Sequence, residues 1–373
     1  MRLYRSWTTL FSVLFLRWVG HPDPPSWAAQ AQTECEAATA TPLRVEDATD
    51  VDVLRAAANC SGGGSLEADW AGAVPLDAPI AIASGVFLSI TGEDVLAEVR
   101  GVSQTRMFEV LPGGRLALAQ LKLSNGTAAV GGGGAIYSES AVLTLSGCSF
   151  HGNVATNGSG GAVWAEGGNV TILGGEFVGN YASMYGGAVA TTGANIELVV
   201  QQGTTFEGNN ALVGGALYCS AAGLVPKLGL VVSSTTASCS LTDSKFISNT
   251  ATGETEEIAL FDEAFLEGVD GGGAVAFLLA TANVTDSVFR GNHAEFSGGA
   301  LLGGNDTDVT VSGCEFDNNT AMEYGGAVAA SSLTVGGGTE LTNNTATLSG
   351  GAVSTSSGRR MVPRERTFIF RGS

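Results

Sequence analysis

The segment Leu143–Trp164, LTLSGCSFHGNVATNGSGGAVW, contains both motifs that decide the fold, Phe-x-x-Asn at Phe150 and Gly-Gly-Ala-Val at Gly160. Gly-Gly-Ala followed by Ile, Val or Leu recurs, beginning at Gly133, Gly160, Gly186, Gly214, Gly272, Gly298, Gly325 and Gly350. The copies are 25 to 28 residues apart, except for one interval of 58 residues, which equals two periods. A fixed period of this length indicates a solenoid with one supersecondary unit per repeat.

Phe-x-x-Asn lies between the Gly-Gly-Ala copies in a constant phase. Its copies begin at Phe150, Phe177, Phe206, Phe246, Phe289 and Phe316, with Leu341 as a relaxed copy. Phe246 falls inside the 58-residue interval, which predicts a repeat that has lost its Gly-Gly-Ala. Apolar residues recur five and seven positions before the Phe, as Leu145 and Leu143 do, and small residues form a bend between them and the Phe. Alternation on both sides of a bend indicates short strands with one buried face.

A repeat of this size suits one turn of a parallel β-helix, because stacked rungs about 4.8 Å apart join their inward faces into one core. In such a stack we expect Phe to pack on Phe, and the Asn to hold a turn through backbone groups of its own and the neighbouring rung. The glycine pair permits a positive φ and a close backbone approach at a sharp corner. The predicted fold is therefore an all-β, single-stranded solenoid.

These paired motifs resemble the repeat of the chlamydial polymorphic outer-membrane proteins, whose twin motifs are Gly-Gly-Ala-[Ile/Val/Leu] and Phe-x-x-Asn. The resemblance covers roughly Leu121 to Ser357. It implies a right-handed parallel β-helix of the pectin-lyase-like type, which that family uses as a surface-exposed passenger for adhesion.

The predicted organisation has four parts. Residues 1–31 are a predicted signal peptide, because Arg2 and Arg5 precede a short apolar stretch and Ala29-Gln30-Ala31 fits a cleavage site. Residues 32–75 are predicted to cap the first rung, with a helix at Ala48–Asn59, and residues 76–357 form the β-helix. Residues 358–373 form a basic tail that is predicted to be disordered. No stretch of the mature chain suits a transmembrane helix, and the predicted location is extracellular or at the cell surface.

Eight N-glycosylation sequons support an extracellular location, since chance predicts about three for this composition. They begin at Asn59, Asn125, Asn157, Asn169, Asn283, Asn305, Asn318 and Asn343.

The chain has six cysteines, an even number that an oxidising compartment allows to pair. Cys35 and Cys60 bracket the predicted helix, and Cys219 and Cys239 lie on adjacent strand segments, so we predict these two disulfides. Cys148 and Cys314 occupy equivalent repeat positions five rungs apart, about 24 Å, which is too far for a disulfide. Buried free thiols are expected there.

Composition limits the partners. Lys and Arg number 17 against 36 Asp and Glu, for a formal net charge of −19. No basic stripe exists to neutralise phosphates, so nucleic acid is excluded as a partner. The cysteine and histidine spacings contain no zinc motif, and neither a metal nor a cofactor is expected.

Carboxylates are the candidate catalytic groups. Glu176, Glu315 and Glu340 share the position before the Phe or its Leu replacement, which predicts one outward column. Glu315 and Glu340 are one rung apart, and glycoside hydrolysis needs two carboxyls about 5 to 10 Å apart. The competing interpretation is a solvated surface column. The insertion 252–271, rich in acidic and aromatic residues, predicts either a lid over a groove or a tolerated insertion.

Two functions follow as expectations. The first is an adhesin-like binding or structural module for extracellular polysaccharide or a cell-surface protein. The alternative is a carbohydrate-active enzyme, a lyase, hydrolase or epimerase, on the same fold. A convergent cluster of acid, base and metal ligand would distinguish the enzyme from the binding module.

Overall fold

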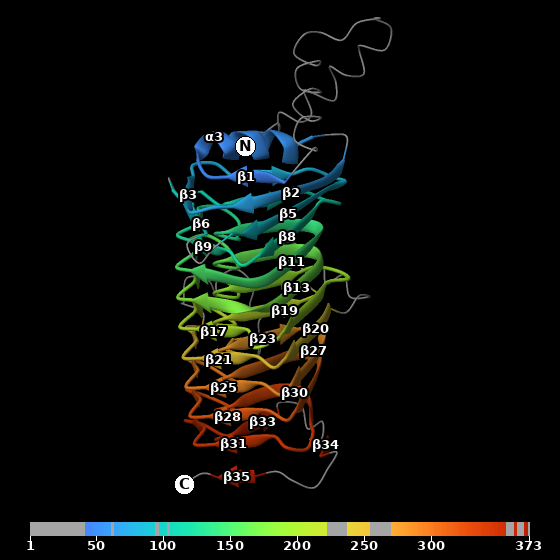
Figure 1. Ribbon diagram of the computed structural model, residues 1–373. Helices are drawn as coiled ribbons and strands as arrows, with labels where there is room; N and C mark the ends of the chain where they lie inside the picture. Colours follow the sequence, from blue (N-terminus) through green and yellow to red (C-terminus); the bar gives the residue numbers. More distant parts are fainter. Residues whose placement is uncertain are drawn as a thin grey trace, which may run out of the picture.

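The computed structural model describes residues 42–60, 63–93, 97–102, 105–221, 237–253, 270–355, 362–363 and 369–371. They form a parallel β-solenoid of about 10 turns, which confirms the predicted fold class. Figure 1 shows the rungs stacked along one axis, with helix α3 at the N-terminal end. Two predicted regions, the signal peptide and most of the insertion 252–271, lie outside the described residues.

Each rung follows three strand faces and a short fourth edge. The Gly-Gly-Ala face contains β4 (Ile80–Ile82), β7 (Phe108–Val110), β15 (Val189–Thr192), β19 (Leu217–Ser220), β23 (Val275–Leu278) and β33 (Val353–Thr355). The aliphatic face contains β1 (Leu43–Val45), β2 (Gly64–Trp70), β5 (Val86–Gly92), β8 (Arg115–Ala119), β16 (Glu197–Gln201), β20 (Ala237–Thr242), β24 (Ala280–Thr285) and β34 (Val362–Pro363).

The Phe face follows next along the chain. It contains β3 (Ala73–Leu76), β6 (Glu98–Gly101), β9 (Lys122–Ser124), β17 (Thr205–Glu207), β21 (Lys245–Ile247), β25 (Val288–Arg290), β28 (Glu315–Asp317), β31 (Glu340–Thr342) and β35 (Ile369–Arg371). The Ala edge is a separate sheet of β10 (Thr127–Ala128), β12 (Val154–Ala155), β14 (Tyr181–Ala182), β18 (Asn210–Ala211), β22 (Thr250–Ala251), β26 (His293–Ala294), β29 (Thr320–Ala321) and β32 (Thr345–Ala346).

Four longer strands bend around the corners and belong to more than one face. β11 (Ile136–His151) and β13 (Val163–Val178) run through all three faces, while β27 (Leu301–Ser312) and β30 (Val328–Val335) join the Gly-Gly-Ala and aliphatic faces. All pairings between rungs are parallel, and Phe150 is in register with Phe177. The outward side chains therefore form columns along the axis.

The predicted repeat without Gly-Gly-Ala is wrong. Leu217 of β19 pairs directly with Val275 of β23, and Phe246 pairs with Phe206 on one side and Phe289 on the other. The 58-residue interval is therefore a single long rung rather than two periods.

Helix α3 (Ala48–Ala58) covers the first rungs, as predicted. Asp47 accepts hydrogen bonds from the backbone of Thr49 and Asp50, and the Asp50 side chain completes a capping box. Val51 and Leu54 of this helix are buried in the core cluster. The sheet begins earlier than the predicted boundary at residue 76, because β1 already pairs with β2 and β2 with β5.

The segment 358–373, predicted to be a disordered tail, contains two strands instead. β34 pairs with β30, and β35 pairs with β31, with Phe370 in register with Leu341. The last complete rung leaves a row of unpaired backbone groups, which a following extended segment can pair with whether or not it carries the repeat motif.

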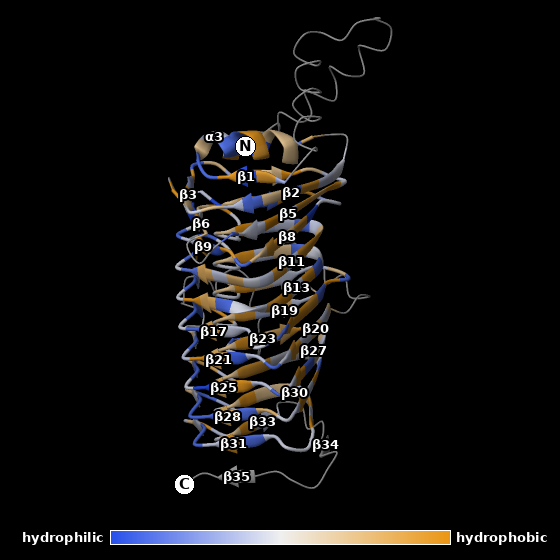
Figure 2. Ribbon diagram, in the orientation of Figure 1, coloured by the Kyte–Doolittle hydropathy of each residue, from blue (hydrophilic) through white to orange (hydrophobic). Residues whose placement is uncertain are grey.

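The core is a set of ladders of identical residue types. Six phenylalanines, Phe150 to Phe316, are buried and stack with ring centroids 4.6 to 4.8 Å apart. Aliphatic residues form parallel columns beside them, and Figure 2 shows these apolar residues along the strands with hydrophilic residues at the corners. Each aromatic stack contributes about 0.5–1.5 kcal/mol beyond the burial of apolar area.

The Asn of Phe-x-x-Asn forms a second ladder, buried at the corner between the Phe face and the Ala edge. Asn249 Nδ2 donates to Asn292 Oδ1 at 3.0 Å and to the Phe206 carbonyl at 3.0 Å. The same pattern links Asn153, Asn180, Asn209, Asn249, Asn292, Asn319 and Asn344. The predicted bonds to backbone groups of the neighbouring rung are confirmed, and the amide side chains also bond directly to one another.

The residue before each ladder Asn has a positive φ. This position is occupied by Gly152, Gly179, Gly208, Ser248, Gly291, Asn318 and Asn343, with φ between 53° and 63°. Left-handed backbone favours Gly and, among other residues, Asn. The full motif is therefore Phe-x-[Gly/Asn]-Asn, with Ser248 as the exception.

Candidate functional site

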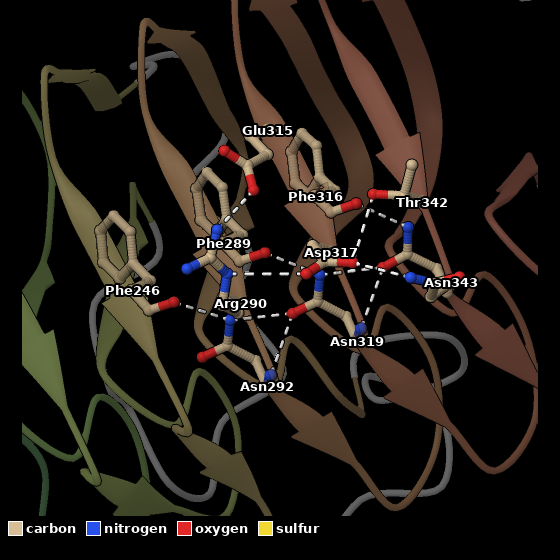
Figure 3. Close-up of polar contacts among 11 residues, drawn as sticks. Phe246, Phe289, Arg290, Asn292, Glu315, Phe316, Asp317, Asn319, Thr342 and Asn343 are labelled. Atoms are coloured by element: carbon tan, nitrogen blue, oxygen red, sulfur yellow. Dashed lines mark hydrogen bonds and ion pairs between the residues drawn. The ribbon is translucent and has the colours of Figure 1, made fainter. Parts of the chain in front are cut away.

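The carboxylates that the sequence proposes as catalytic lie on the Phe face. Glu315 and Glu340 are direct partners in the register between β28 and β31, so the predicted outward column is confirmed. Glu315 is partly exposed and Glu340 is exposed. Figure 3 shows Glu315 beside the arginine of the preceding rung.

This arginine, Arg290, forms an ion pair with the Glu315 carboxylate. Arg290 Nη2 lies 2.6 Å from Glu315 Oε1, and Arg290 Nε lies 3.6 Å from Asp317 Oδ2. The hydrogen bond to Glu315 raises the pKa of the Arg290 guanidinium. Asp317 in turn accepts hydrogen bonds at 3.2 Å from Thr342 Oγ1 and from Asn343 Nδ2 (Figure 3). The result is a chain of polar contacts across three rungs.

Glu176, another carboxylate on this face, has an imidazole and a hydroxyl partner on the adjacent rung. Glu176 Oε1 contacts His151 Nε2 at 3.0 Å and accepts a hydrogen bond from Ser149 Oγ at 3.1 Å. Side chains of adjacent rungs thus contact one another along the column, and these contacts align the rungs.

Glu98 is the carboxylate of this face whose charge is paired most completely. It is 9% exposed and contacts Arg100 at 2.9 Å and Lys122 at 3.2 Å, while Ser124 Oγ donates to it at 2.5 Å. Burial acts to raise the pKa of Glu98, but the hydrogen bonds from Ser124, Lys122 and Arg100 outweigh burial and lower it. Glu98 is therefore a structural anion.

The contacts of Glu315 bear on its predicted role as an acid. A glycosidase acid must present a proton to the glycosidic oxygen, and Arg290 Nη2 contacts one of the two oxygens of Glu315, Oε1. Among the described residues, no group of three or more His, Cys, Asp or Glu could hold a metal ion. The arrangement places hydrogen-bonding side chains on successive rungs of the Phe face.

The cysteines agree with the predictions wherever the structure describes them. Cys219 of β19 and Cys239 of β20 form a disulfide, with Cα atoms 6.6 Å apart. Cys60 is disulfide-bonded, and its predicted partner Cys35 lies outside the described residues. Cys148 and Cys314 are buried free thiols, and burial raises the pKa of each to about 11.

Seven sequon asparagines have described side chains, and all seven are exposed: Asn59, Asn125, Asn157, Asn169, Asn283, Asn318 and Asn343. The side chain of Asn305 lies outside the described part. The ladder asparagines Asn153 to Asn319 are buried, at 0 to 1% exposure. Glycosylation stays a prediction, and the geometry of these seven residues permits it.

One cluster of outward residues was missed by the sequence analysis. Tyr137 and Trp164 follow Gly-Gly-Ala-Ile and Gly-Gly-Ala-Val and are partners in the register between β11 and β13. Their ring centroids are 5.2 Å apart. Their place in the repeat could have predicted that both rings face outward, because each follows the inward Ile or Val of its strand.

In the part of the chain that the structure describes, no helix is long and apolar enough to cross a membrane. Comparison with known proteins finds no matching family model, no matching curated protein and no matching solved structure.

Proposed function

We propose that this protein is a cell-surface or secreted binding and structural module, a rigid rod whose outward columns contact extracellular polysaccharide or a surface protein. The repeat would then be a relative of the polymorphic outer-membrane protein repeat, with the right-handed, pectin-lyase-like geometry that the resemblance implies. The observation that carries the proposal is the parallel register between successive rungs. It repeats each outward position from rung to rung on a core held by buried Phe and Asn ladders.

A long ligand with a short chemical repeat gains from such a surface, because each additional rung adds a similar contact at no further cost in orientation. Rigidity adds to this gain, since little conformational entropy is lost from the protein on binding. The exposed sequon positions support an extracellular setting, where polysaccharides are the most abundant extended partners.

The test is size-exclusion chromatography of the mature chain with a panel of cell-wall polysaccharides, with and without calcium. Co-elution with polymers of unchanged length supports the proposal. Shortening of any polymer contradicts it and favours the enzyme alternative. In that case Glu315→Gln and Glu340→Gln show whether the predicted pair is responsible, with Glu207→Gln as the control for an exposed carboxylate on the same face.

A further inference from the structure

We infer that Tyr137, Trp164, Glu139 and Glu166 form a binding subsite for neutral polysaccharide on the Gly-Gly-Ala face. This inference rests on the proposed function and deepens it by naming the site and the class of ligand. The four residues, which we call the aromatic patch, are outward residues of β11 and β13, with Tyr137 opposite Trp164 and Glu139 opposite Glu166. Both rings and Glu166 are partly exposed, and Glu139 is exposed.

The indole of Trp164 is held in place by its surroundings. Trp164 Nε1 donates to Thr192 Oγ1 of the next rung at 3.4 Å, and the ring packs against the cluster that includes the fully buried Ala190. The indole therefore leans over the next rung, where the small Ala190 leaves room for it. A fixed aromatic surface is what the apolar C–H face of a sugar ring packs against.

The glycine run beside this patch fits the same purpose. A Cβ on Gly132 would lie 2.7 Å from Trp164 Cε3 and would also collide with the Ser159 carbonyl. The backbone of this loop thus lies against the edge of the indole, which explains why Gly131 and Gly132 precede the usual glycine pair here. The close approach restricts the ring to one position.

Polar groups beside the rings are oriented as well. Tyr137 Oη donates to Glu166 Oε2 at 2.7 Å, so this carboxylate is fixed and its other oxygen is left to accept a ligand hydroxyl. Burial and the Glu166 hydrogen bond raise the pKa of Tyr137, which keeps the phenol a donor. The Arg106 guanidinium lies 5.0 Å from the centre of the Tyr137 ring and donates to the Val130 carbonyl. One ring face of Tyr137 is therefore already covered.

Charge identifies the ligand as neutral. Glu109, Glu139 and Glu166 surround the two rings on three successive rungs. Among the described residues, Arg106 is the one cation in contact with either ring. Carboxylates accept strong hydrogen bonds from sugar hydroxyls but repel uronate and sulfate groups. Adjacent rings one rung apart suit consecutive sugars of one chain that runs along the solenoid axis.

The test is native affinity electrophoresis of the full mature chain in gels that contain laminarin, galactomannan or hydroxyethyl cellulose, with polygalacturonate and alginate as acidic polymers. We expect retardation by a neutral polymer, at least tenfold weaker binding for Trp164→Ala, and partial recovery for Trp164→Phe. Tyr181→Ala, which removes an aromatic ring that is 43% exposed on the Ala edge, is the matched control and should bind like the unaltered chain. Circular dichroism checks that each variant is folded.

The outcomes separate this inference from the proposed function. If a neutral polymer retards Trp164→Ala as strongly as the unaltered chain, the aromatic patch is not the site, although the protein still binds polysaccharide. If only acidic polymers cause retardation, the assignment of a neutral ligand is wrong. If no polymer causes retardation, the aromatic patch is refuted as a polysaccharide site, and the proposed function then depends on a protein partner.

Discussion

Replacing Asn249 by Ala perturbs the middle of the asparagine ladder. The Asn249 side chain takes part in four hydrogen bonds: it donates to Phe206 O and Asn292 Oδ1, and it accepts from the backbone N–H and Nδ2 of Asn209. Asn209 Nδ2 keeps its bond to Phe177 O, and Asn292 Oδ1 keeps its bond to the Asn249 backbone. The substitution therefore leaves two backbone groups without these partners, the Phe206 carbonyl and the Asn209 N–H.

A buried backbone group without a partner costs about 1–3 kcal/mol, so the two together predict a loss of about 2–6 kcal/mol in the free energy of unfolding. The matched control is Asn283→Ala, because Asn283 is exposed on β24 and lies outside the ladder. Its substitution should change the unfolding free energy by no more than about 0.5 kcal/mol.

Both variants are compared by urea denaturation followed by circular dichroism, with hydrogen exchange of the flanking rungs as a local measurement. Exchange is included because a solenoid can unfold in parts. We expect faster exchange at the rungs of Phe206 and Asn292 than at the N-terminal rungs. A loss below about 1 kcal/mol for Asn249→Ala, or one equal to that of Asn283→Ala, would refute the structural role of the ladder.

Three further outcomes are expected. Ser248→Gly should raise the unfolding free energy by about 0.5–1 kcal/mol, because Ser248 has a φ of 53°, and Gly208→Ala, at the equivalent open position, should lower it similarly. Glu98 has a lowered pKa in the fold, so its stabilising contribution is present above the ordinary pKa and lost as the pH falls through the folded one. Glu98→Gln should therefore flatten the acid limb of a stability profile. Cys148 and Cys314, with pKa values raised to about 11, should react with iodoacetamide at pH 8 only after unfolding.

The solenoid could be predicted from sequence because its core repeats. An inward Phe must pack on the residues one rung above and below it, so the same residue type recurs at Phe177, Phe206 and Phe246. The same argument predicted the position of the ladder Asn. It also predicted the column of Glu315 and Glu340, because outward positions share the same register.

The repeat could not predict the contacts of outward side chains, because these do not pack in the core. The contact of Arg290 with Glu315 depends on which residues fill two adjacent outward positions, and the period does not constrain these. The aromatic patch was missed for the same reason, since Tyr137 and Trp164 share their column with Ala190. The left-handed position before the ladder Asn was visible as a Gly or Asn in most copies but was not recognised.

The ends depart from the prediction because pairing of backbone groups does not require the motif. Strands β2 and β3 join the sheet inside the predicted cap, and β34 and β35 extend it into the predicted tail. Main-chain hydrogen bonds along an open rung are available to any extended segment.

The most direct test of the central claim, that this solenoid binds a neutral polysaccharide without cleaving it, is calorimetric titration of the mature chain with laminarin, galactomannan and hydroxyethyl cellulose. Each polymer is recovered afterwards for measurement of its chain length. The account predicts saturable heat with at least one polymer and an unchanged chain length in every sample. Shortened chains after incubation, or no heat with any of the three, would contradict it.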